Sequence, residues 1–233
     1  ARFLPVEIVA DVKAPPAVPA VGGHIEIELA GGHRMRISGS YDPEALARLI
    51  RYDRARDHYS VRHGPFEESE FPGLPRQDWT LLVQDVDKWD ADVRALLEQF
   101  RFLPRWRIDD IMVSFAAPGG SVGAHVDQYD VFLLQAQGHR RWQIDASPGA
   151  PQDFRADADL KLLREFTPSH DWVLGPGDML YLPPGVPHHG VAEDACLTFS
   201  VGMRAPSAAE LMGDYIDTLA GEEPLEIRVA GRP

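Results

Sequence analysis

From Tyr52 onward, the sequence consists of short apolar runs separated by turn residues. Short strands between Gly, Pro and Asp turns are typical of an antiparallel double-sheet barrel. The runs that we interpret as strands are Leu81–Val86, Ile111–Ala116, Ala124–Gln128, Val131–Gln137, Arg141–Asp145, Asp178–Leu182 and Cys196–Met203. The segments with the spacing of amphipathic helices are Ala91–Phe100, Leu160–Phe166 and Ser207–Leu219. We therefore expect a mainly β fold with peripheral helices.

The first 50 residues follow a different pattern. Segment 14–23 contains too many prolines for a helix or a central strand and is expected to be an extended linker. Alternation over His24–Leu29 and Arg34–Ser38, on either side of a Gly-Gly turn, predicts a β-hairpin, and we expect a short helix from Asp42 to about Arg51. The chain is therefore divided into an appendage, residues 1–50, a barrel domain, residues 51–220, and a tail, residues 221–233.

Charge and composition limit the classes of function. The formal net charge of -13 argues against a general nucleic-acid binder and favours a basic partner. A single cysteine, Cys196, excludes an internal disulfide. We see neither a signal-peptide pattern nor an apolar stretch long enough for a bilayer, so we expect a cytoplasmic protein with no membrane contact.

A histidine and an aspartate stand in alternate positions at His125 and Asp127, and a second histidine, His188, follows much later. Alternate residues of a strand face the same side, so His125 and Asp127 can reach one metal ion, and a histidine on a neighbouring strand can complete the set. Two histidines and one carboxylate with open positions form the ligand set of non-haem Fe(II) oxygenases. Each residue alone is more often a packed or surface side chain than a ligand, so the prediction depends on the combination.

The third candidate follows a corner that should be rigid. The strand expected over Asp178–Leu182 ends at Pro183-Pro184-Gly185, where proline fixes its own φ and glycine permits a positive φ. His189 is the adjacent competitor, but consecutive strand residues face opposite sides, so only one of the two should be a ligand. We choose His188 because it directly follows the proline turn.

Seven blocks of sequence carry a resemblance to a known family. In this order and spacing they resemble the bacterial ribosomal-protein arginine hydroxylases, JmjC-type members of the cupin superfamily, over about residues 54–220. The blocks are R-H-G-P-F, W-T-L-L-V-Q-D-V, W-R-I-D-D-I-M-V-S-F, P-G-G-S-V-G-A-H-V-D-Q-Y-D-V-F-L-L-Q, R-R-W-Q-I, G-P-G-D-M-L-Y-L-P-P-G-V-P-H-H-G and F-S-V-G-M-R-A-P.

The resemblance implies a double-stranded β-helix, or jelly-roll, barrel and an Fe(II)- and 2-oxoglutarate-dependent dioxygenase, with dioxygen as second cosubstrate. The implied substrate is the β-carbon of an arginine in the sixteenth protein of the large ribosomal subunit. The implied iron ligands are His125, Asp127 and His188. Arg140 matches the residue that holds the distal carboxylate of 2-oxoglutarate, a task that suits the planar guanidinium. Ser114 is a candidate to add a hydroxyl to that carboxylate, and a structural hydrogen bond is an equal alternative.

Acidic groups near the expected site can attract a cationic arginine. The candidates are Asp109, Asp110 and Asp130. Turn caps and solvated surface are more common roles for any one of them. We expect a basic ribosomal protein as partner and no direct nucleic-acid binding.

Residues 3–50 carry a second, less specific resemblance, to accessory proteins encoded by insertion-sequence transposable elements. It depends on F-L-P-V-E-I-V, I-E-I-E-L, a Gly-Gly-x-R-x-R turn and Y-D-P-E-A-L-A-R-L-I. An unrelated N-terminal hairpin is the alternative.

The hydroxylases normally have a further N-terminal region and, after the barrel, a helical dimerisation region, which we do not find here. Oligomeric state, stability and substrate recognition therefore stay open. Two other functions remain: a degenerate, non-catalytic cupin module, or an oxygenase for another basic protein or a small molecule. Succinate production with and without a substrate peptide would separate them.

Overall fold

The computed structural model describes residues 24–29, 33–38, 47–156, 158, 160–204 and 208–221. The chain divides into two compact units, Ala1–Met203 and Arg204–Pro233, which are described separately. In the described residues, the first unit holds the strands and the short helices, and the second holds helix α4, Ala208–Gly221.

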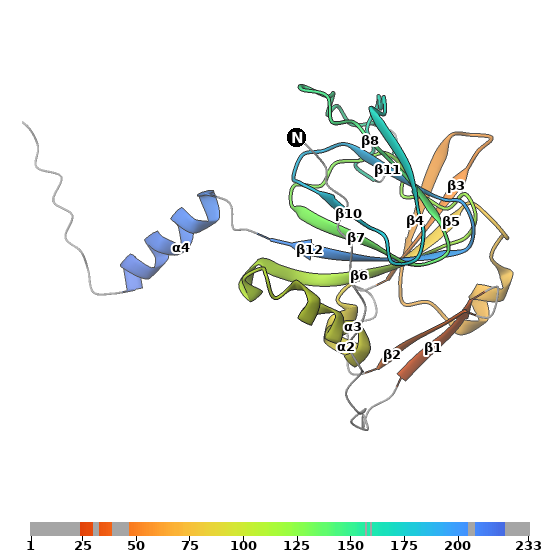
Figure 1. The fold of residues 1–233 in the computed structure, drawn as a ribbon, viewed down its shortest axis with the longest axis horizontal. Coiled ribbons are helices and arrows are strands. Elements are labelled where there is room, and N and C mark those ends of the chain that lie inside the picture. The colour runs from red at the N-terminus through yellow and green to blue at the C-terminus, as the bar shows by residue number, and fades with distance from the viewer. Residues whose placement is uncertain are drawn as a thin grey trace, which may run out of the picture. The chain divides into compact units, whose positions relative to one another are not determined.

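Two antiparallel sheets form the body of the first unit. The strands of the larger sheet are β3 (Ala47–Asp53), β4 (His58–His63), β5 (Trp79–Val83), β6 (Ile108–Ala116), β7 (Asp130–Gln137), β10 (Met179–Leu182) and β12 (Cys196–Met203). Those of the smaller sheet are β8 (Arg140–Ile144), β9 (His170–Leu174) and β11 (His188–Ala192). Their orders are β10-β7-β12-β6-β5-β3-β4 and β11-β8-β9. Strands β8 and β11 lie across from β7 and β12 (Figure 1), so the predicted mainly β fold is confirmed.

The predicted N-terminal hairpin is also confirmed. Strands β1 (His24–Leu29) and β2 (His33–Ser38) form a two-stranded antiparallel sheet in which His24 lies opposite Ser38. The linker expected over residues 14–23 lies outside the described residues.

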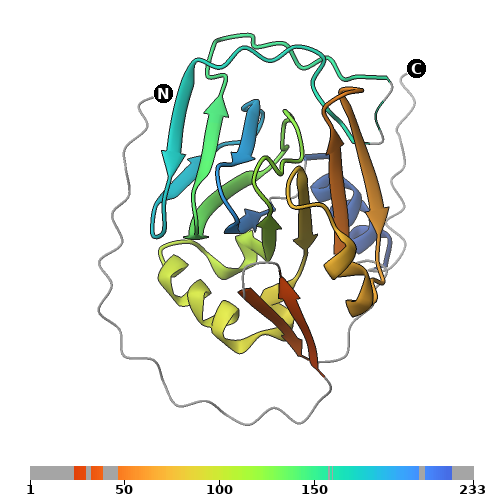
Figure 2. The ribbon, with the colours of Figure 1, turned by 90° about the vertical axis from the view of Figure 1, so that its right-hand side faces the viewer.

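The helix expected from Asp42 to Arg51 is wrong where the structure describes it. Residues from Ala47 onward form strand β3, which pairs with β5 on one side and with β4 on the other. Leu49 and Ile50 are both buried, in clusters on opposite faces of the sheet. A strand buries consecutive residues on its two faces, and this tertiary pairing outweighs the local helical spacing. Strand β3 therefore crosses the boundary that the sequence suggested after residue 50, and it lies between β5 and the edge strand β4 of the larger sheet (Figure 2).

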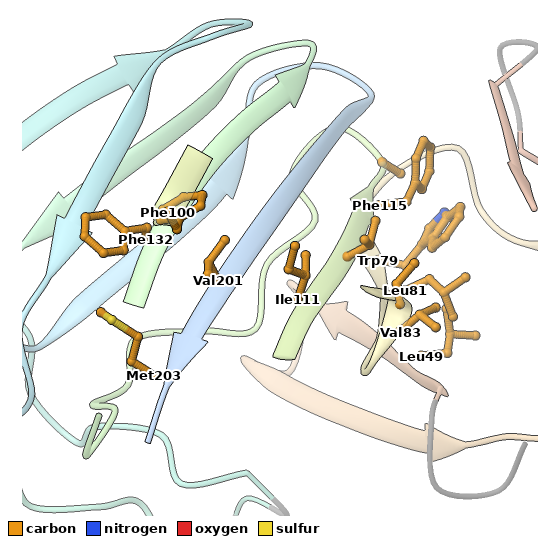
Figure 3. Close-up of a cluster of buried hydrophobic side chains, with 13 residues drawn as sticks. Leu49, Trp79, Leu81, Val83, Phe100, Ile111, Phe115, Phe132, Val201 and Met203 are labelled. Carbon is orange, nitrogen blue, oxygen red and sulfur yellow. The ribbon is translucent and has the colours of Figure 1, made fainter. Parts of the chain in front are cut away.

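The outer face of the larger sheet is covered by short helices. They are α2 (Val86–Trp89), α3 (Ala91–Leu96), η2 (Leu97–Phe100) and η3 (Arg105–Arg107), with η1 (Glu68–Gly73) nearer the start of the chain. Figure 3 shows the apolar cluster beneath them, in which Phe100 faces Phe132 and Ile111 lies beside Val201. The predicted helix Ala91–Phe100 is confirmed, as an α-helical turn followed by a 3-10 turn.

The space between the two sheets holds a second apolar cluster and a set of polar residues. Val131 and Leu133 from β7 pack with Trp142 and Ile144 from β8. Each buried aliphatic side chain stabilises the fold by about 1.5–3 kcal/mol. The polar side chains Ser114, Gln135, Arg140, His188, Thr198 and Ser200 are buried as well. Apolar residues thus hold the two sheets together, whereas the polar set is available for a site.

Two further predictions were wrong. The helix expected over Leu160–Phe166 is irregular chain, because Leu163 N–H bonds to Ala124 O and forms a bridge with Phe154. The strand expected over Ala124–Gln128 is reduced to a single bridge at His125. Strands β4, β9 and β11 were not predicted. Helix α4 matches the helix expected over Ser207–Leu219, although it belongs to the second unit.

None of the helices in the described part of the chain has the length and apolar character that crossing a membrane requires.

Candidate metal centre

The backbone around His125 and His188 brings together residues that are far apart in sequence. His125 N–H bonds to His188 O at 3.0 Å, and His188 N–H bonds to His125 O at 2.9 Å. Asp127 O accepts from the N–H of Gly185, whose φ of +79° forms the proline corner. His125 therefore reaches its position by pairing with His188, and Asp127 by bonding to the corner before it, not through a strand of their own.

The three predicted ligand side chains converge. One ligand atom from each of His125, Asp127 and His188 lies within 4.8 Å of the others. His125 Nε2 is 4.0 Å from Asp127 Oδ1, and His188 Nε2 is 3.6 Å from Asp127 Oδ2. The two imidazole centroids are 4.2 Å apart. These separations suit three donors around one ion.

Backbone carbonyls fix the orientation of both imidazoles. His125 Nδ1 is 2.9 Å from Gly123 O, and His188 Nδ1 is 3.0 Å from Val186 O. A carbonyl oxygen only accepts, so the proton of each neutral ring belongs on Nδ1. Nε2 then carries its lone pair toward Asp127, which is the arrangement found when histidine binds a metal.

Burial shifts the pKa of two of the three candidate ligands. His188 is only 2% exposed, and burial, followed by the nearby His125, lowers its pKa to about 3. Burial raises the pKa of Asp127, and His125 and a hydrogen bond from Tyr129 oppose that shift. The imidazole of His188 is therefore neutral near pH 7. Two imidazole nitrogens and one carboxylate, with other directions left to small ligands, fit a divalent transition metal such as iron(II).

His189 does not join this group. Its ring lies against Phe166, with centroids 6.1 Å apart and planes at 88°, and burial lowers its pKa to about 4. The two adjacent histidines thus face different surroundings, as alternation along a strand requires.

Arg140 and Ser114 lie together in the interior. Arg140 is 3% exposed and donates from Nη1 to Ser114 Oγ at 3.3 Å and from Nη2 to Gly190 O at 3.4 Å. Its Nε has no hydrogen-bond partner, and within the described residues no carboxylate is among the groups that act on its charge. Burial lowers the pKa of Arg140. Burial of an unpaired cation costs free energy, so a bound anion beside Arg140 would be stabilising.

The three acidic candidates differ in surroundings. Asp130 accepts from Tyr181 Oη at 2.5 Å and pairs with Arg107 at 3.3 Å. Asp109 is exposed. Asp110 is partly buried on the same face of β6 as Ser114, and burial raises its pKa. It lies opposite Gly202 in the register of β6 and β12. Of the three, Asp110 alone shares a strand face with the buried polar set.

Side-chain contacts connect the candidate ligands to their neighbours. The Arg140 guanidinium lies 5.1 Å from the centre of the Trp142 ring, and Trp142 is 6.1 Å from the ring of His188. On the other side, Tyr129 bonds to Asp127. A Cβ placed on Gly202 would lie 4.0 Å from the Tyr129 ring and 3.3 Å from Asp110 Oδ1.

Contacts therefore connect the candidate ligand His188 to Arg140 through Trp142, and the candidate ligand Asp127 to Tyr129. Sequence reasoning missed Trp142, Gly190 and Tyr129. Alternation from Arg140 could have found Trp142, because the two residues share one strand face.

Comparison with known proteins gives consistent matches. The model of the JmjC domain matches residues 95–211. Over 182 residues the chain is 42% identical to the ribosomal protein uL16 3-hydroxylase of Escherichia coli, covering 78% of this chain and 48% of that protein. It is 38% identical over 198 residues to a probable ribosomal oxygenase of Haemophilus influenzae, covering 81% and 49%.

A solved structure matches as well. YcfD, a ribosomal oxygenase from Escherichia coli in complex with cobalt and 2-oxoglutarate, aligns with a TM-score of 0.69 at 38% identity, covering 82% of this chain and 50% of that one. The chain spans about half the length of the curated relatives it matches. The resemblance of residues 3–50 to transposable-element accessory proteins gains no support from these matches.

Proposed function

This chain belongs to the JmjC domain family, and on that premise we propose that it is an iron(II)- and 2-oxoglutarate-dependent oxygenase that hydroxylates a ribosomal protein. The observation that carries the proposal is the convergence of His125, Asp127 and His188 within 4.8 Å. The solved relative that carries cobalt and 2-oxoglutarate supports the same cofactor class.

The residues that would hold the metal are the two imidazole Nε2 atoms and the Asp127 carboxylate. Their Nδ1 bonds to backbone carbonyls hold the rings in place before a metal arrives, so little reorganisation is needed on binding. When bound, iron(II) and 2-oxoglutarate would supply the oxidising chemistry with dioxygen. The protein contributes fixed ligands, a charged anchor for the cosubstrate and an orientation for the substrate carbon.

Arg140 is the residue that would hold the distal carboxylate of 2-oxoglutarate. Its guanidinium is buried and lacks a carboxylate partner in the described chain, so a bound carboxylate would supply the missing charge. Ser114 Oγ touches the guanidinium at 3.3 Å and would lie beside the same carboxylate. Trp142 contacts both this anchor and His188, and it would help to hold a bound keto acid near the metal ligands.

Asp110, which is partly buried on the same face of β6 as Ser114, is the group that would attract a cationic side chain. The proposed substrate is an arginine of uL16, the sixteenth protein of the large subunit, hydroxylated at its β-carbon. The Escherichia coli relative, a ribosomal protein uL16 3-hydroxylase, supports this choice, because position 3 of an amino acid is its β-carbon. The net charge of -13 favours such a basic partner.

The test is an anaerobic titration with iron(II) and 2-oxoglutarate followed by visible absorption spectroscopy. A weak charge-transfer band is expected in the wild type and in His189→Ala, whose ring lies outside the ligand group, and no band is expected in His125→Ala. Circular dichroism should show that all three proteins are folded. A folded wild type without the band would rule out the proposed centre.

A further inference from the structure

The charge of Arg140 is unusual for a buried group because nothing in the described chain neutralises it. The ion pairs of the neighbouring Arg141, to Asp171 and Glu193, show the common alternative on the exposed side of the same strand. Arg140 instead contacts neutral groups: a hydroxyl, a carbonyl and an aromatic ring. Neutral contacts hold the guanidinium in place and leave its full charge available.

The largest of these contacts is the ring of Trp142. Arg140 and Trp142 are two residues apart on β8 and therefore share a face. The guanidinium carbon lies 5.1 Å from the ring centre, which is within the range of a cation–π contact. Trp142 is itself only 5% exposed, and its indole N–H has no hydrogen-bond partner. Packing against its neighbours, and not a hydrogen bond from the indole N–H, therefore holds the ring in the interior.

Gly190 provides the space for this stack. It lies opposite Trp142 in the β11–β8 register, and its carbonyl accepts from Arg140 Nη2. A Cβ at this position would lie 2.6 Å from Trp142 Cζ3, 2.7 Å from Cη2 and 2.9 Å from Arg140 Nε. Any larger residue must therefore displace the ring, the guanidinium or both.

We propose that Trp142 and Gly190 are positioning residues that hold the Arg140 guanidinium without neutralising it, and so set the affinity and selectivity of the site for a dicarboxylic keto acid. This inference rests on the proposed function. It assigns selectivity to two residues that need not touch the metal. An acidic residue in either place would compete with the incoming carboxylate, and a small apolar residue at position 142 would leave the guanidinium unsupported.

The test compares two ligands that differ in one group. 2-Oxoglutarate and 2-oxopentanoate have the same keto-acid end, but 2-oxopentanoate ends in a methyl group where 2-oxoglutarate has its distal carboxylate. Dissociation constants would be measured by calorimetry on the full chain loaded with cobalt(II). In Trp142→Leu, 2-oxoglutarate should bind about tenfold or more weakly, whereas 2-oxopentanoate should change by less than about twofold. Trp142→Phe, which keeps a ring but has no N–H, should retain most of the affinity.

Two further variants separate positioning from general packing. Gly190→Ala should show the same selective loss of 2-oxoglutarate, since it displaces the ring, the guanidinium or both without removing any donor. Trp172 lies opposite Trp142 on β9 and packs against the same apolar cluster. Trp172→Leu removes an equally large side chain and should lower the melting temperature without changing the ratio of the two dissociation constants.

The outcomes are distinct. If Trp142→Leu and Gly190→Ala weaken the binding of both keto acids equally, this inference is overturned and the proposed function stays intact. The same holds if neither variant weakens the binding of either acid. A wild type that does not distinguish the two acids would overturn the anion site of the proposed function, and this inference with it. If Trp142→Leu does not fold, Gly190→Ala and Trp142→Phe decide the question.

Discussion

The backbones of His125 and His188 form one antiparallel bridge, with N–H to O distances of 3.0 Å and 2.9 Å in the two directions. The two side chains lie on the same side of this bridge, with ring centroids 4.2 Å apart. The spacing of two candidate ligands is therefore set by hydrogen bonds between main-chain atoms. Four expectations about the site follow from its contacts.

Metal binding should stabilise the fold only when His188 is present. At cobalt(II) concentrations near 100 times the dissociation constant, the wild type should gain about 2.7 kcal/mol in free energy of unfolding. His188→Ala should gain almost nothing, and His189→Ala should gain nearly the full amount because its ring faces Phe166. Urea unfolding with and without the metal measures both values. An equal gain in His188→Ala would exclude that residue as a ligand.

Stability of the metal-free protein should fall as the pH drops from about 6.5 toward 4. Burial lowers the pKa of His188 to about 3 and that of His189 to about 4, so in this range the unfolded chain binds more protons than the folded chain. Each histidine changes the free energy of unfolding by up to about 1.4 kcal/mol per pH unit. The raised pKa of Asp127 acts in the opposite direction.

Urea unfolding in the presence of a chelator, between about pH 7.5 and pH 5, checks this pH dependence. His189→Asn should flatten it, since one of the two titrating groups is then absent. The explanation fails if the wild type and this variant respond to pH identically.

Removing the charge of Asp110 should impair use of a basic substrate. In Asp110→Asn, kcat/KM for an arginine-containing uL16 peptide should fall by roughly 30-fold or more, because a partly buried charge pair is lost. Conversion of 2-oxoglutarate without peptide should be unchanged. Asp109→Asn is the matched control, since Asp109 is exposed and points to the other face of β6. A similar loss in both variants would contradict a specific role for Asp110.

Gly123 should tolerate no side chain. Its φ is +83°, and a Cβ there would lie 2.7 Å from Leu162 Cδ2. Gly123→Ala should cost more than the approximately 1–2 kcal/mol of a left-handed backbone alone, and it should weaken metal binding because Gly123 O orients His125. Gly149 has a φ of +75° with no atom within 4 Å of such a Cβ, so Gly149→Ala measures the backbone cost alone. Equal losses in urea unfolding would show that the Leu162 contact is unimportant.

Strands with clear apolar runs could be predicted from the sequence. The bounds of β12 match the expected Cys196–Met203, and β6, β7, β8 and β10 lie within three residues of their expected positions at either end. Strand β9 escaped prediction because it starts His-Asp and is largely exposed, so it lacks an apolar alternation. Strand β3 was misread because Ala-Leu-Ala-Arg-Leu-Ile suits a helix until its partners β4 and β5 are known.

For the candidate site, the sequence singled out three side chains that the structure brings together, but through a partly wrong argument. His125 and Asp127 were expected to share a face of one strand, but only His125 takes part in a bridge, and the corner at Gly185 holds Asp127. Long-range pairing of this kind leaves no local signal in the chain. The ligand roles of His125, Asp127 and His188, and the cosubstrate roles of Arg140 and Ser114, stay predictions, as does a cytoplasmic location.

Because the bridge between His125 and His188 fixes the distance between the two imidazoles, that distance does not depend on how many residues connect them. The turn at Ser147–Ala150, where Ala150 N–H bonds to Ser147 O, is exposed and makes no part of the bridge. Insertions or deletions there would leave both imidazoles where they are. The length of this exposed turn can therefore vary without changing the spacing of the two imidazoles.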